Sequence, residues 1–85
     1  MPLFRFKVEG DHAEDLIELS TISAAKCQAV KYAGERICDE ADHFWDAGEF
    51  TLTVSDDQGL TIVVLMMTGV EAAASMGAPR PAGLN

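Results

Sequence analysis

The sequence predicts an α+β domain of ββαββ order, in which one antiparallel-rich sheet carries a single long helix on one face. Three observations predict this fold. Apolar and polar residues alternate with a period of two near both ends of segment 3–68, which is typical of half-buried strands. The middle of that segment has apolar residues at helical spacing. Clusters of glycine and aspartate separate the elements and favour turns.

The first two strands are expected at residues 3–9 and 16–19. In the first, aromatic and β-branched residues alternate with charged ones, so one face is expected in the core. Residues 10–15 combine glycine with aspartate and supply turn chemistry. The second strand therefore pairs with the first as a hairpin.

The helix is expected at about residues 22–39, with a frayed or irregular extension through 40–46. A hydroxyl of Ser20 or Thr21 is placed to cap its first turn. The apolar stripe consists of Ile22, Ala25, Ala29, Val30, Ala33 and Ile37. Because several of these side chains are small, the helix is expected to lie close against the sheet.

The last two strands are expected at residues 49–55 and 60–68, joined by a turn in which Gly59 takes the left-handed conformation. The final strand is apolar on both faces, which is typical of a strand that is covered on both sides or meets another molecule. We expect Val63, Leu65 and Met67 to form its outer face, because the rest of the chain offers little to cover them.

The domain is expected to span residues 1–69, followed at 70–85 by a short helix and a flexible Pro/Gly/Ala-rich tail. No apolar run approaches the roughly 20 residues that span a bilayer, and the amino terminus lacks the features of a secretory signal. Cys27 and Cys38 fall in the same predicted helix, too far apart to bridge each other. Unbridged thiols predict a cytoplasmic protein.

The charge excludes some partners. The chain has 14 acidic against 6 basic residues, a formal net charge of −8. This argues against sequence-independent nucleic-acid binding and against docking on an anionic membrane. No phosphate-binding loop or catalytic constellation is present, so we expect a protein that is not an enzyme and uses no cofactor.

One cluster contains residue types that bind metals: Cys38, Asp39, Asp42 and His43. Asp39 and His43 are four residues apart and share a face if the helix continues, which suits a divalent metal. A structural zinc site needs four ligands, mostly Cys and His, and only two of this kind occur here. An acidic, solvated helix end is the favoured interpretation, and the metal site is the less favoured alternative.

The outer strand face leads to the main functional hypothesis, a non-enzymatic interaction module that forms a homodimer or binds another protein. Its candidate contacts are Val63, Leu65, Met67 and Trp45. Trp is enriched among binding hot spots, although Trp45 with Phe44 is also suited to close the end of the core. A small metal- or ligand-binding protein is the alternative.

The order of these elements resembles a family of short bacterial proteins of unknown function. The resemblance covers roughly residues 2–68 and implies a fold but no activity. Its motifs lie at Pro2, at Phe4 with Phe6, at Gly10-Asp11, at 24–25 with Ala29, and at the turn 54–59. Residues 13–15 depart from it, because an Asp-Glu-Gly turn is expected there. The first hairpin and the Ala-rich helix are also similar to small antitoxin domains, which implies an acidic regulator of a basic partner.

Overall fold

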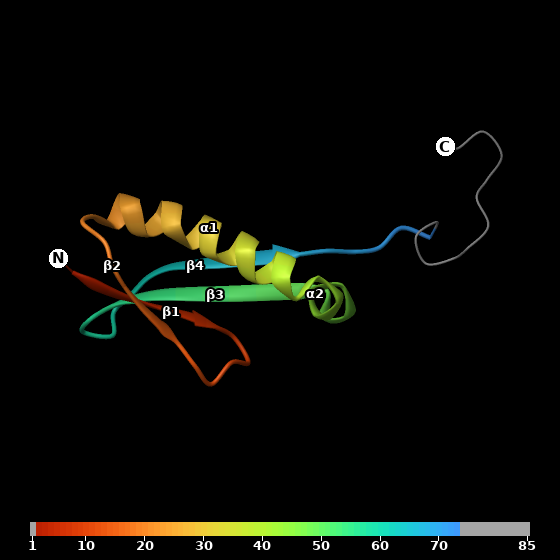
Figure 1. Ribbon diagram of the computed structural model, residues 1–85, viewed down its shortest axis with the longest axis horizontal. Coiled ribbons are helices and arrows are strands. Elements are labelled where there is room, and N and C mark those ends of the chain that lie inside the picture. Colours follow the sequence, from red (N-terminus) through yellow and green to blue (C-terminus); the bar gives the residue numbers. More distant parts are fainter. Residues whose placement is uncertain (1, 74–85) are drawn as a thin grey trace.

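The predicted α+β fold is confirmed by a computed structural model that describes residues 2–73 (Figure 1). Four strands form one sheet, and a long helix lies across one face. The elements in chain order are β1 (Leu3–Val8), β2 (Asp15–Glu18), α1 (Ile22–Asp39), α2 (Ala41–Ala47), β3 (Glu49–Asp56) and β4 (Thr61–Thr68). Residues 70–73 are not helical. The rest of the predicted short helix and tail, residues 74–85, lies outside the described residues.

The strand order is β2-β1-β3-β4, and every neighbouring pair is antiparallel. The predicted first hairpin is confirmed by the pairing of β1 with β2. The chain then crosses the sheet through both helices and returns as β3, which pairs with the other side of β1. As a result, β1 and β3 are central, and β2 and β4 are the two edges.

Helix α1 has the predicted bounds and is capped by Thr21, whose Oγ1 accepts a hydrogen bond from Ala24 N at 3.0 Å. The expected single helix with a frayed extension is wrong in one respect, because residues 41–47 form a separate helix. Glu40 leaves the helical conformation, with φ −122° and ψ 43°, and α2 starts after it. Gly48, at φ 78°, ends α2 in the left-handed conformation that glycine favours.

The core lies between α1 and the sheet. Its buried residues are Phe4, Phe6, Val8, Ala25, Ala29, Ala33, Leu52 and Val54. The three alanines permit the close approach that the sequence predicts. The buried stripe is narrower than expected, because Ile22 and Val30 are 51% and 58% exposed. These two side chains lie on the helix surface rather than against the sheet.

The expected orientation of β4 is wrong. Val63, Leu65 and Met67 face α1, because they pair with core-facing residues of β3; Leu65, for example, lies opposite the buried Leu52. The outer face of β4 is formed instead by Val64 and Met66, which are 54% and 69% exposed.

A register shift between β3 and β4 is the physical reason. Ser55 lies opposite Thr61, whereas Val54 lies opposite Val63, so β4 contains one extra residue at Ile62. Continuing the Ser55–Thr61 register would place Val64 opposite Leu52, on the helix side. A shift of one residue exchanges the two faces of a strand, and the bulge therefore turns Leu65 toward the core.

Candidate functional site

The outer face of β4 is an apolar surface on a half-polar sheet. Val64 lies opposite Thr53, and Met66 lies opposite Thr51, both on β3. The threonines are partly buried, whereas both β4 side chains are exposed. Within residues 2–73, α1 covers the other face of the sheet. Val64 and Met66 thus present apolar area to solvent at the edge of the molecule.

Within residues 2–73, no strand pairs with the outer edge of β4, which is therefore the open edge of the sheet. The Gly69 N–H donates to the Gly48 carbonyl at 3.0 Å, in the same register that pairs β3 with β4. Hydrogen-bonded and non-hydrogen-bonded pairs alternate along an antiparallel ladder. Residues 63, 65 and 67 therefore point their N–H and C=O groups at β3. Val64, Met66 and Thr68 point theirs at the open edge.

In the described part of the chain, the open edge of β4 lacks the features that usually prevent strand pairing. Natural edge strands are kept short or carry charged residues, prolines or covering elements that prevent pairing with another chain. β4 has eight residues, none charged and none proline. It is a ready template for an additional strand.

Trp45 lies at the carboxyl end of this strand. It packs edge-on against the buried Phe44, with ring centroids 5.2 Å apart. Both rings abut Gly69, where an added Cβ would come within 2.7 Å of Trp45 Cζ3 and 2.8 Å of Phe44 Cε2. Trp45 itself remains 45% exposed. Phe44 is therefore buried at this end of the sheet, and Trp45 is an exposed apolar side chain beside the end of β4.

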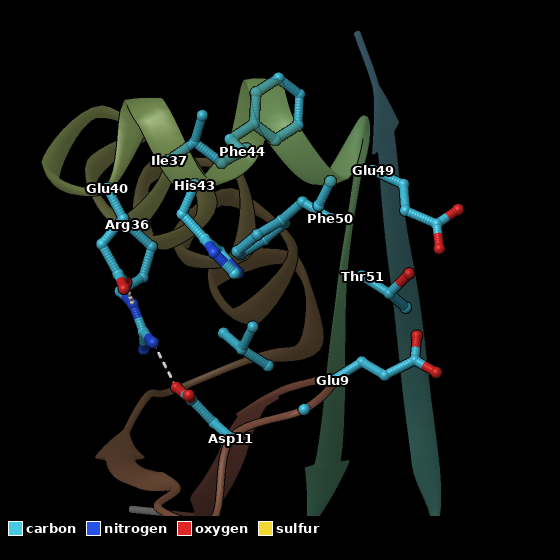
Figure 2. A pocket seen from close by; sticks show the side chains of 13 residues that line it. Glu9, Asp11, Arg36, Ile37, Glu40, His43, Phe44, Glu49, Phe50 and Thr51 are labelled. Carbon is cyan, nitrogen blue, oxygen red and sulfur yellow. Dashed lines mark hydrogen bonds and ion pairs between the residues drawn. The ribbon is translucent and has the colours of Figure 1, made fainter.

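A cavity of about 260 Å³ lies where the two helices meet the end of the sheet (Figure 2). Val8, Ile37, Phe44 and Phe50 supply its apolar walls. The imidazole of His43 points into it beside Phe50. The cavity is large enough for a small molecule.

The polar rim of the cavity is centred on Arg36 of α1. Its Nε donates to Glu40 Oε2 at 2.9 Å, and its Nη2 donates to Asp11 Oδ2 in the β1–β2 loop. The hydrogen bond to Asp11, and secondly the one to Glu40, raise the pKa of Arg36 above its usual value. The guanidinium is therefore held in place by carboxylates of this chain.

One turn earlier, Tyr32 makes a similar contact with β2. Its hydroxyl donates to Asp15 Oδ2 at 2.6 Å, and its ring lies 5.4 Å from that of Phe6. Burial, followed by the hydrogen bond to Asp15, raises the pKa of Tyr32. Tyr32 and Arg36 together tie the β2 side of the sheet to α1.

The comparisons with known proteins identify a family. Residues 3–68 match the family described as Domain of unknown function (DUF6894). The match begins with the first residue of β1 and ends with the last residue of β4. The chain belongs to this family. No curated protein and no solved structure matches it.

The described residues of this DUF6894 protein do not assemble the metal-binding cluster. Within residues 2–73, no group of three or more His, Cys, Asp or Glu side chains is placed to hold a metal ion. Of Cys38, Asp39, Asp42 and His43, only His43 lines the cavity. Cys27 and Cys38 are both free and exposed. Among the described helices, none is long and apolar enough to cross a membrane.

The sequence did not predict two features of this DUF6894 protein. The first is the pair Tyr32 and Arg36, which contacts Asp15 and Asp11. The spacing of four residues places Tyr32 and Arg36 on one face of α1, but no residue pattern indicates their partners. The second is the outward orientation of Val64 and Met66. No residue pattern marks it, because the bulge at Ile62 decides it.

Proposed function

We propose that this DUF6894 chain is a non-enzymatic protein-interaction module that binds a partner along β4 by adding a strand to its sheet. The observation that carries the proposal is the uncharged open edge of β4, eight residues long. Strand addition uses backbone hydrogen bonds for affinity and alternate side chains for specificity. Val64 and Met66 offer both, since their backbone groups point outward and their side chains are exposed.

The distribution of charge also supports strand addition at the edge of β4. Residues 9–18 contain five acidic residues, and residues 35–49 contain six. β2 carries Asp15 and Glu18, whereas residues 61–68 carry no charge. A partner strand therefore meets no like charge and leaves no carboxylate unpaired at β4. We also infer a cytoplasmic location, which the two free, exposed thiols support.

Hydrogen exchange of the labelled chain tests the proposal. The amides of Val64, Met66 and Thr68 are expected to exchange fast in dilute buffer. In an extract of the source cells, or at high concentration of the chain itself, they are expected to become protected. The amides of Val63 and Leu65 are the internal control, because β3 protects them in every condition. Fast exchange of the outward amides under all conditions would refute binding at this edge.

The cavity supports a second candidate function, the binding of a small ligand at the end of α1. Its apolar walls suit a ring or short alkyl chain, and its rim has more carboxylates than cations. We therefore expect a small aromatic amine such as phenethylamine to raise the melting temperature, and phenylacetate to have no effect. Ile37→Trp, which fills the cavity, should abolish that shift. Equal responses to both compounds would exclude this candidate.

A further inference from the structure

The partner of β4 can be specified further from the geometry of the edge. In a pair of identical strands related by a two-fold axis perpendicular to the sheet, opposed residues must point to the same face. One residue of β4 must therefore lie opposite its own copy, and the axis passes between the two strands, midway between these two residues. The regular part of the strand beyond the bulge, residues 63–67, is centred on Leu65.

With the axis at Leu65, both the backbone groups and the side chains of the two β4 strands are complementary. Val64 of one copy then lies opposite Met66 of the other, and both point their N–H and C=O groups at the partner strand. On the helix side, Val63 lies opposite Met67, which extends each core toward the other. All of these pairs are apolar, so the backbone hydrogen bonds form without placing a polar side chain against an apolar one.

Charge selects β4 rather than β2 as the edge at which two copies can pair. Two chains of net charge −8 repel each other wherever their acidic segments meet. The β2 edge brings Asp15 and Glu18 together in any self-pairing, whereas β4 brings no charge. A strongly basic partner would instead be attracted to the acidic segments and would find no carboxylate along β4.

The exposed flank of α1 supplies contact area beyond the strand. Val30 is two residues from Tyr32 and thus about 200° away around the helix. Because Tyr32 binds Asp15 on the β2 side, Val30 lies on the flank toward β4, where it is 58% exposed. A two-fold axis perpendicular to the sheet places both helices on the same face, so these two flanks lie toward each other. A strand contact alone is small beside the 1,200–2,000 Å² or so that specific interfaces bury.

We infer that the partner is a second copy of this chain, joined through antiparallel β4 strands centred on Leu65 into one eight-stranded sheet. The inference rests on the proposed function and names its partner and register. The order of strands across the dimer is β2-β1-β3-β4 followed by the same order reversed. Both α1 helices lie on one side of the sheet, and the acidic β2 edges are at its two ends.

Sedimentation of the purified full chain from about 1 to about 500 µM tests the inference. We expect a concentration-dependent dimer. Met66→Lys should weaken it at least about tenfold, since a charge on an open edge opposes strand pairing. Leu16→Lys is the matched control, because Leu16 is an exposed residue of β2 on the same outer face. It should leave the dimer unchanged.

Cross-linking tests the register. In a background with both Cys27 and Cys38 replaced by Ser, chains with Val64→Cys and chains with Met66→Cys are mixed and oxidised. The mixed disulfide should form preferentially, because directly opposed residues in a hydrogen-bonded antiparallel pair have Cα atoms about 5.5 Å apart. Preferential formation of either homodisulfide would overturn the register.

The outcomes separate this inference from the proposed function. A monomer at every concentration, or a dimer that Leu16→Lys disrupts and Met66→Lys does not, would overturn self-pairing. If the outward amides of a monomeric chain still become protected in cell extract, strand addition stands with another partner. If they do not, both proposals fail.

Discussion

The two edges of the sheet differ in length, charge and attachment. β2 has four residues, two of them acidic, and α1 holds that side through Tyr32 and Arg36. β4 has eight residues without charge and is attached through its ladder with β3 and its apolar inner face. Short length and acidic residues oppose strand addition at β2, and β4 has neither feature. Among the elements described in residues 2–73, β4 is therefore the edge suited to pairing with another strand.

The largest expected effect on stability distinguishes the inner face of β4 from its outer face. Leu65→Glu places a charge against Leu52 in the core and should lower the free energy of unfolding by about 3 kcal/mol or more. Met66→Glu, one residue away on the outer face, should change it by less than about 0.5 kcal/mol. Urea denaturation at low protein concentration measures both. Equal losses would contradict the assigned orientation of the strand.

The next effect concerns the end of β4. Gly69→Ala brings a Cβ against Trp45 and Phe44 and should cost about 1–3 kcal/mol by overpacking. Gly34→Ala is the matched control, because nothing lies within 4 Å of the added Cβ in α1. That change should stabilise the protein by about 0.5–1 kcal/mol. Thermal or urea unfolding gives both values, and a neutral Gly69→Ala would refute the close packing.

A smaller effect is expected at the attachment of the β2 side. Arg36→Met keeps most of the side-chain stem but removes the hydrogen bonds to Asp11 and Glu40. We expect a loss of about 1 kcal/mol, since the group is partly exposed. Amide exchange in residues 10–14 should also become faster. Lys31→Met, at an exposed position without an ion pair in the described part of the chain, should change neither quantity.

The smallest effect is a pH dependence at Tyr32. Because the folded protein raises the pKa of this phenol, its contribution to stability is complete below the ordinary value near 10 and is lost as the pH rises through the raised value. Tyr32→Phe should cost about 0.5–1 kcal/mol at about pH 8 by removing the bond to Asp15. At about pH 11 that difference should shrink. Urea titration of both proteins measures it, and a constant difference would contradict the raised pKa.

Local patterns predicted most of this fold. Alternation located β1 and β3, and short segments beside turn residues located β2 and β4, each to within a residue or two; Ser20 and Thr21 marked the start of α1. The sequence does not predict the break between α1 and α2 at Glu40, because the residues on both sides of it favour a helix. The sequence does not predict the strand order either, since it depends on which strands, distant in the sequence, pair with each other.

The candidate site was predicted only in part. The two apolar faces of the last strand directed the functional hypothesis to β4, but the sequence did not indicate which face enters the core. The bulge at Ile62 decides between Leu65 and Val64, and a bulge depends on the geometry of the whole hairpin. The contacts from Tyr32 and Arg36 to the β2 side needed knowledge of how α1 lies across the sheet.

The same bulge affects how the chain folds. Without it, the hairpin of β3 and β4 would bury Val64 and Met66 in place of Leu65 and Met67, with almost the same gain from hydrophobic burial. The search for the native state therefore includes two competing hairpins that hydrophobic patterning barely distinguishes. The turn is the same in both: Asp56 Oδ1 accepts hydrogen bonds from the N–H groups of Gln58 and Leu60, at 2.9 and 2.8 Å. A single extra residue of β4, Ile62, thus decides which side chains become the core.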